Sequence, residues 1–269
     1  MLIKTGYEII FDMAVPVPML LMLFTHPERE ADLVEPERLQ FEPYIPHETF
    51  IDWFGNRVAR IIAPPGRLRI TNNIMVRDSG ELETMPAENA RQIPVQELPT
   101  DVLQFLLGSR YCEVDKLSDI AWNLFGNTPL GWPRVKAIVD WCHHNVEFGY
   151  CHARSTKTAY DVYIERKGVC RDFMHLSVTM LRCMNIPARY ATGYLGDIGI
   201  PEQPFPMDFS AWFEVYLDNQ WYTLDARHNE PRIGRILMAR GRDAVDVALT
   251  TSFGLANLEK FTVWTDEVK

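Results

Sequence analysis

A cysteine that follows a glycine turn is the residue of this chain most able to do chemistry. Residues 168–173 read Gly-Val-Cys-Arg-Asp-Phe, and the apolar spacing after them predicts a helix from about Cys170 to Met184. A cysteine attacks as its thiolate, and the unpaired amides and positive dipole end of a helix N-terminus lower the pKa of a thiol placed there. The same amides can bind the oxyanion of a tetrahedral intermediate. Cys170 is therefore a candidate nucleophile, although an unpaired cysteine is more often a small core residue.

A second stretch predicts two strands that would face this cysteine. Residues 209–217 read Phe-Ser-Ala-Trp-Phe-Glu-Val-Tyr-Leu, and residues 221–225 read Trp-Tyr-Thr-Leu-Asp. If the Asp-Asn pair between them forms a two-residue hairpin turn, Trp212 lies opposite Asp225, with Ser210 diagonal to Asp225 on the same face. A histidine at that diagonal position would complete a set of nucleophile, base and orienting carboxylate. The chain has Ser210 instead, and a hydroxyl does not accept a thiol proton near neutral pH.

Three groups of histidines could replace the missing base. His228 comes three residues after Asp225, on the opposite strand face unless the chain bends there, and it is the candidate substitute base. His175 lies about 140° around the helix from Cys170 and is expected to be structural. The remaining candidates, His143, His144 and His152, are also expected to be structural. The spacing of these histidines does not indicate a metal site. Asp172, two residues after Cys170, is expected to cap the start of the helix.

The elements that must position these residues predict an α+β chain with two domains. Residues 1–95 are proline-rich and strand-like, with β-prone runs at 7–11 and 68–76, which predicts a β-sandwich-like domain. Residues 96–269 predict a second domain that contains the candidate site, after a linker at 86–99. Helices are expected at 101–107, 117–125, from Pro133 onward and at 158–165, and a strand at 189–195. Helices followed by antiparallel strands are typical of an α+β fold.

Bulk properties exclude several classes of partner. A net charge of −9 and a pI near 5.3 argue against nucleic-acid binding. The apolar stretch 13–24 is shorter than a bilayer span and contains two prolines, so we expect a core strand and no signal peptide or membrane contact. Five scattered cysteines and no Cys-x-x-Cys pair favour reduced thiols, a cytoplasmic location and no zinc. No cofactor is expected, and the oligomeric state stays open.

The motifs resemble those of the bacterial transglutaminase-like cysteine protease family. The resemblance rests on residues 168–173, on Ile-Pro-Ala-Arg-Tyr-Ala-Thr-Gly-Tyr at 186–194, and on the two strand motifs already described. The specific motifs lie between about 165 and 230, and the strand-rich N-terminal third also looks like the region that precedes this domain in many bacterial members. The resemblance implies a papain-like fold, with a catalytic Cys, His and Asp at the positions of Cys170, Ser210 and Asp225.

The resemblance also implies what the chain would act on. Calcium-dependent members of the family crosslink proteins, whereas bacterial relatives of this size are inferred to hydrolyse amide bonds; nothing here resembles a calcium loop. The leading hypothesis is a cysteine peptidase or amidase that acts on a peptide or protein substrate through a Cys170 thioester. The rival hypotheses are an inactive member that binds a peptide-like ligand in the same cleft, and an acyltransferase. Because Ser210 replaces the base, the activity depends on whether another group substitutes for it.

Overall fold

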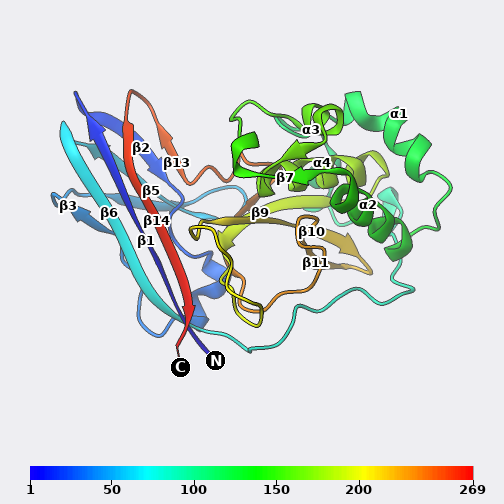
Figure 1. Ribbon diagram of the computed structural model, residues 1–269, viewed down its shortest axis with the longest axis horizontal. Coiled ribbons are helices and arrows are strands. Elements are labelled where there is room, and N and C mark those ends of the chain that lie inside the picture. Colours follow the sequence, from blue (N-terminus) through cyan, green and yellow to red (C-terminus); the bar gives the residue numbers. More distant parts are fainter. Residues whose placement is uncertain (269) are drawn as a thin grey trace.

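The computed structural model describes residues 1–268 and consists of a β-sandwich beside a mixed α/β unit (Figure 1). Each layer of the sandwich is a four-stranded antiparallel sheet. One sheet has the order β14 (Asn257–Glu267), β1 (Leu2–Met13), β6 (Gly66–Arg77) and β3 (Gln40–Glu42). The other has the order β13 (Thr250–Ser252), β2 (Val17–Leu21), β5 (Arg57–Ala63) and β4 (Glu48–Ile51).

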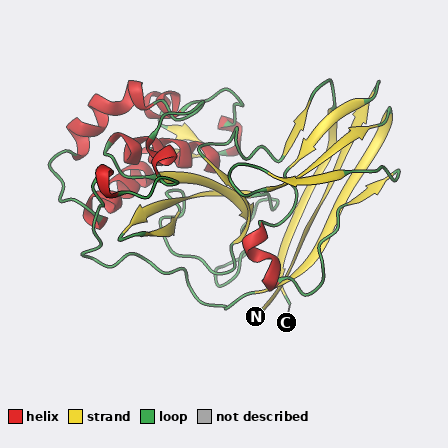
Figure 2. Cartoon of the chain, turned by 180° about the vertical axis from the view of Figure 1, so that it is seen from behind, coloured by secondary structure: helices red, strands yellow, loops and turns green. Residues whose placement is uncertain are grey.

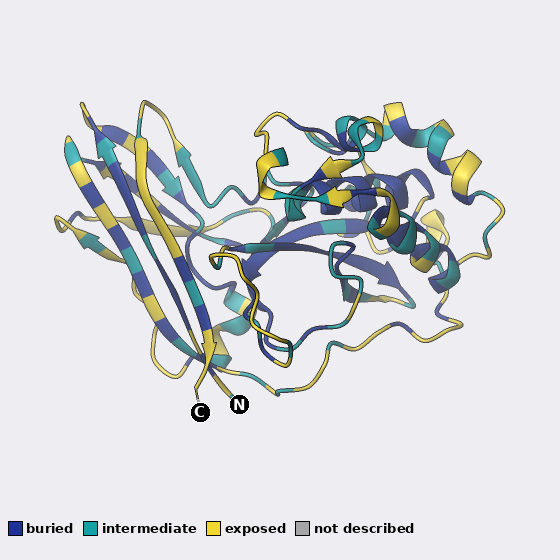
Figure 3. Cartoon of the chain, in the orientation of Figure 1, coloured by how far each residue is buried: buried dark blue, intermediate teal, exposed yellow. Residues whose placement is uncertain are grey.

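Alternation of apolar and polar residues explains why these strands form a sandwich. Buried and less buried residues alternate along most of β6, so one face of the strand packs inward (Figure 3). The long strand β1 contributes Tyr7 and Ile9 to the core between the sheets. Gly6 is required where β1 meets β6, because a Cβ there would lie 2.2 Å from the carbonyl oxygen of Asn72. The predicted β-rich N-terminal region is confirmed.

The sandwich differs from the predicted division of the chain at residues 95 and 96. Strands β13 and β14 come from the C-terminal end, yet they pair with β2 and β1, from Ile3 opposite Glu267 to Asp12 opposite Asn257. The domain assigned to residues 1–95 therefore lacks two of the eight strands that the two sheets contain. Local periodicity could not show this, because the strands that pair are separated by most of the chain.

The α/β unit stacks four helices on one side of a third antiparallel sheet (Figure 2). The helices are α1 (Val114–Phe125), α2 (Trp132–Asn145), α3 (Ala159–Glu165) and α4 (Cys170–Cys183). The sheet has the order β11 (Gln220–Leu224), β10 (Ser210–Leu217), β9 (Ala188–Tyr194) and β12 (Ile236–Gly241). Helix α4 is the centre of this unit, since it contacts the other three helices and the sheet and is buried from Asp172 to its end. The α+β prediction is confirmed.

Short elements complete the chain. A parallel pair of two-residue strands, β7 (Glu147–Phe148) and β8 (Lys167–Gly168), lies just before α4. The 3-10 turns are η1 (Pro27–Asp32), η2 (Val95–Glu97), η3 (Leu103–Leu106) and η4 (Tyr150–His152). The helix predicted at 101–107 is wrong in type, because only the single turn η3 forms there. None of the helices between residues 1 and 268 is long and apolar enough to cross a membrane.

The hairpin that organises the site forms as predicted. Asp218 and Asn219 have φ angles of 47° and 62°, the left-handed values that a two-residue hairpin turn requires. The resulting register runs from Leu217 opposite Gln220 to Phe213 opposite Leu224, which is the predicted register up to the residue before Asp225. The hairpin register therefore directs the start of β10 and the end of β11 toward the same end of the sheet.

Candidate active site

Cys170 is the first residue of α4 and is partly buried. The turn before it is fixed by Asp172, whose Oδ2 accepts the Val169 amide at 3.0 Å and whose Oδ1 accepts Arg171 Nη2 at 3.0 Å. Gly168 allows this carboxylate to approach, because a Cβ at residue 168 would lie 2.6 Å from the Asp172 Cβ. Asp172 thus has the structural role predicted for it, and the turn delivers Cys170 to the amide-rich end of the helix.

The pKa of the Cys170 thiol is raised, opposite to the predicted lowering. Burial is the largest cause, because it removes the water that would solvate a thiolate, and the nearby carboxylates of Asp208 and Asp225 act in the same direction. The positive charge of Arg227 and a hydrogen bond from the Ala211 amide oppose this shift without reversing it. The resting group is therefore a thiol near neutral pH, and nucleophilic attack requires a base.

His228 is held by the carboxylate of Asp225. Strand β11 ends at Leu224, and the chain then turns, with the Asn229 amide bonded to the Asp225 carbonyl oxygen at 2.7 Å. This bend overturns the straight-strand expectation, and it brings His228 Nδ1 to 2.7 Å from Asp225 Oδ2. His228 and Asp225 therefore form an imidazole–carboxylate pair. A base that replaces the histidine missing at Ser210 needs such a carboxylate to orient it.

Asp225 is buried and accepts hydrogen bonds on both oxygens. Its Oδ1 accepts the backbone amides of Arg227 and His228 at 2.9 and 3.3 Å, and its Oδ2 also accepts Arg235 Nη2 at 3.0 Å. Burial alone would raise the pKa of this carboxyl, but the charge of Arg235 and the hydrogen bond from His228 hold it well below its usual range. Asp225 is therefore a carboxylate at any pH near neutrality.

A residue from the segment that follows β6 supports this carboxylate. Glu83 Oε1 lies 2.6 Å from Arg235 Nε, and Glu83 Oε2 accepts the Arg232 amide at 2.9 Å. Burial raises the pKa of Glu83, while Arg235 opposes the shift. A continuous chain of ion pairs and hydrogen bonds thus runs from Glu83 through Arg235 and Asp225 to His228. Sequence patterns do not indicate Glu83 and Arg235, because no local motif connects residues so far apart.

Ser210 begins β10, where its backbone carbonyl accepts the Thr192 hydroxyl at 3.0 Å. Three of the other histidines, His175, His143 and His144, have structural partners. His175 is buried, accepts the Ala244 amide on Nε2 at 3.1 Å and stacks on Tyr111. His143 Nδ1 lies 3.0 Å from the Arg227 carbonyl oxygen, and His144 Nδ1 lies 2.6 Å from that of Asp140. In residues 1–268, no group of three or more His, Cys, Asp or Glu side chains could hold a metal ion.

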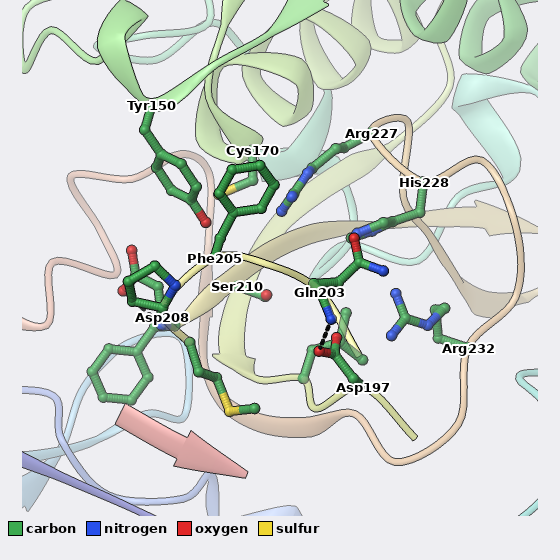
Figure 4. Close-up of a pocket in the computed structure, with 14 residues that line it drawn as sticks. Tyr150, Cys170, Asp197, Gln203, Phe205, Asp208, Ser210, Arg227, His228 and Arg232 are labelled. Carbon is green, nitrogen blue, oxygen red and sulfur yellow. Dashed lines mark hydrogen bonds between the residues drawn. The ribbon is translucent and has the colours of Figure 1, made fainter. Parts of the chain in front are cut away.

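Cys170, Ser210 and His228 line one small cavity of about 70 Å³ (Figure 4). Its other lining residues are about evenly divided between apolar side chains and polar or charged ones. They include Phe205 and Gln203 of the loop between β9 and β10 (Figure 4). Further lining residues that the sequence analysis did not single out are Asp197, Asp208, Arg227 and Arg232. Asp208 lies two residues before Ser210, and burial raises the pKa of its carboxyl.

Arg227 is the cation that acts on the thiol. Figure 4 shows its side chain extending from the His228 side of the cavity toward Cys170. Its guanidinium carbon lies 3.8 Å from the centroid of the Phe148 ring, which fixes the direction of the side chain. Its position directly before His228 is the signal that could have revealed it.

Replacing Arg227 with glutamine is expected to slow alkylation of Cys170 by iodoacetamide several-fold at pH 7.5. The charge that opposes the raised pKa is lost, so the thiolate fraction falls. Mass spectrometry of the labelled Cys170 peptide measures the rate. Arg227→Lys keeps a positive charge and is the matched control; equal rates in the two variants would show that the charge has no effect on the thiol.

The comparisons with known proteins agree with this geometry. The family described as "Transglutaminase-like superfamily" matches residues 123–226. A crystal structure described as "a Putative Cysteine Protease from Cytophaga hutchinsonii" is 32% identical, with a TM-score of 0.85 over 100% of this chain and 91% of that chain. This chain belongs to the transglutaminase-like superfamily. The matched residues include Cys170, Ser210 and Asp225 and end just before Arg227 and His228.

Curated relatives of this superfamily member are uncharacterized mycobacterial proteins. One from Mycobacterium leprae is 28% identical over 116 residues, which are 42% of this chain and 42% of that protein. One from Mycobacterium tuberculosis (strain H37Rv) is 33% identical over 96 residues, or 32% of this chain and 31% of that protein. The chain thus spans less than half the length of each of these relatives. The predicted resemblance to the superfamily and the predicted fold are confirmed.

Proposed function

We propose that this chain is a cysteine peptidase or amidase that cleaves peptide or amide bonds through a thioester on Cys170. The observation that carries the proposal is the position of His228. It lines the same cavity as Cys170, while its Nδ1 is held by the ionised Asp225. In this proposal His228 supplies the imidazole that Ser210 cannot supply.

The hydrogen bond to Asp225 selects the useful tautomer of His228. An ionised carboxylate accepts a proton donor, so Nδ1 carries the hydrogen and Nε2 keeps its lone pair. Nε2 takes the Cys170 proton as the sulfur attacks the carbonyl carbon, and the amides at the start of α4 bind the oxyanion. The imidazolium then protonates the leaving amine as the thioester forms. Water, activated by the same nitrogen, releases the acid and restores the thiol.

Two rival functions use the same cleft. Acyl transfer follows the same steps, except that an amine takes the place of water at the thioester. Binding without catalysis is favoured by two observations, namely Ser210 at the family position of the base and the raised pKa of the Cys170 thiol. We also propose a cytoplasmic location and a peptide or protein partner; five unpaired cysteines among the described residues support a reducing compartment.

Incubation with a mixture of synthetic peptides of known sequence tests the proposal, with cleavage products identified by mass spectrometry. We expect cleavage by the wild-type protein, none by Cys170→Ala, and loss of cleavage in step with iodoacetamide labelling of Cys170. The exposed Cys151 is the reference for ordinary thiol labelling. Products joined to added putrescine would indicate acyl transfer. Peptide binding without cleavage, and no dependence of any reaction on Cys170, would establish the binding protein.

A further inference from the structure

A second and larger cavity lies between the sandwich and the α/β unit and reaches Cys170. Its volume is about 470 Å³. The sandwich contributes apolar side chains from β1 and β14, and the segment after β12 contributes others; among them are Ile9, Phe11, Leu258, Phe261, Val247 and Leu249. A cavity of this size is in the range of sites that bind small molecules or parts of a peptide.

The two cavities meet at the thiol. Both are lined by Cys170, Ser210 and Asp208, and by Tyr150 at the η4 turn. They differ in chemistry, because the small cavity has several charged walls. Among the residues that line the large cavity, only Arg171 and Asp208 carry charge, and Arg171 is already paired with Asp172. A substrate bound over Cys170 would therefore place the part on one side of its cleaved bond in the small charged cavity and the part on the other side in the large apolar cavity.

The position of His228, the proposed general acid, indicates which cavity holds the amine side of the cleaved bond and which holds the acyl side. The leaving amine must receive its proton from His228, and His228 lines the small cavity and not the large one. The amine side of the bond therefore lies in the small charged cavity, and the acyl side extends toward the sandwich. We infer that the large cavity binds a bulky apolar side chain, aromatic or branched aliphatic, on the acyl side of the bond that is cleaved.

Strand β14 is the part of the sandwich that would recognise this side chain. Leu258 is 56% exposed and Phe261 is 40% exposed, and both line the large cavity from the sandwich side (Figure 3 shows how exposed β14 is). Phe261 also packs edge-on against Phe209, which precedes Ser210. The strand-rich domain is thus a wall of the binding site, and it would choose the substrate while the α/β unit performs the reaction.

Labelling with three peptidyl chloromethyl ketones tests this inference. The three probes differ only in the residue beside the ketone, which is phenylalanine, alanine or glutamate. The Cys170 sulfur displaces chloride from the methylene carbon, and the thiol proton passes to His228. We expect the phenylalanine probe to label Cys170 about tenfold to a hundredfold faster than the alanine probe, and the glutamate probe to label most slowly. The inference rests on the proposed function, and iodoacetamide labelling of Cys170 is measured alongside.

A pair of variants makes the test specific. Leu258→Asp is expected to reduce the ratio of phenylalanine to alanine labelling several-fold, because it places a charge in the apolar wall. Leu255→Asp, at a residue that is 88% exposed and lines neither cavity, should leave the ratio unchanged. Equal labelling by the phenylalanine and alanine probes, or an unchanged ratio in Leu258→Asp, would overturn this inference but not the proposed function. No labelling of Cys170 by any probe or by iodoacetamide would instead refute the proposed function.

Discussion

Replacement of His228 with glutamine is expected to slow peptide cleavage by about 10²–10⁴-fold, the contribution of a positioned acid–base group. Glutamine can still hydrogen-bond to Asp225, but it cannot accept the Cys170 proton or protonate the leaving amine. Cleavage rates are compared after the amount of folded protein is matched by circular dichroism. The matched control is His144→Gln, at a histidine whose Nδ1 bonds to the Asp140 carbonyl oxygen and which does not line the small cavity.

A double variant tests whether the base acts from position 228 or from position 210. In the double variant His228→Gln with Ser210→His, a new imidazole stands at the family position, and we expect cleavage to recover at least tenfold over His228→Gln, within the contribution of such a group. Ser210→His alone is expected to change cleavage little, because His228 already serves. If Ser210→His alone strongly raised cleavage and His228→Gln had no effect, the serine would be what disables the site and His228 would not be the base.

Asp225→Asn is expected to reduce cleavage by about 10⁴-fold, the cost of a wrong imidazole tautomer in a nucleophile–base–carboxylate set. Four donors meet the carboxylate: two backbone amides on Oδ1, and His228 Nδ1 and Arg235 Nη2 on Oδ2. An asparagine has only one oxygen. If it faces the backbone amides, its NH₂ faces His228 Nδ1 and forces the hydrogen onto Nε2, where the lone pair is needed.

The same substitution is expected to destabilise the protein by about 3–5 kcal/mol at pH 7, since it removes one partner of a buried charge pair. The pKa of Asp225 is lower in the folded than in the unfolded chain, so its contribution is complete above the unfolded value of about 3.9 and is lost as the pH falls below it. The difference in the free energy of unfolding between wild type and Asp225→Asn should therefore shrink by roughly 1 kcal/mol between pH 7 and pH 3.

Urea denaturation at the two pH values measures these differences. The control is Asp119→Asn, at an exposed α1 residue that forms none of the hydrogen bonds or ion pairs found among the described residues. If the difference in the free energy of unfolding between wild type and Asp225→Asn stayed constant from pH 7 to pH 3, Asp225 would not be ionised in the folded protein. Full activity in Asp225→Asn would contradict its role in orienting His228.

Local chemistry made the first half of the site predictable. The glycine turn, the helix that begins at Cys170 and the Asp218-Asn219 hairpin depend on residues close in sequence, and each forms where expected. The hairpin register then follows from a period of two residues, which is why residue spacing alone relates Ser210 to Asp225.

The second half depended on features that a sequence pattern does not show. The orientation of His228 required that β11 end at Leu224 and the chain bend after Asp225. The rise in the pKa of Cys170 follows mainly from the burial of its thiol, which residues far apart in the sequence produce. Glu83 reaches Arg235 across the fold, and β14 returns to β1 from the far end of the chain. All of these are long-range contacts, for which neither propensity nor motif spacing gives a signal.

The return of β14 also sets the order in which the chain can fold. Strand β1 pairs with β6 on one side and with β14 on the other, and the whole α/β unit lies between β6 and β14 in sequence (Figure 1). On the ribosome, one edge of β1 stays unpaired until β14 has been made, and such an edge can pair with other chains. A nascent chain that stalls before residue 257 would therefore have its thiol helix complete and its sandwich open, exposed to aggregation.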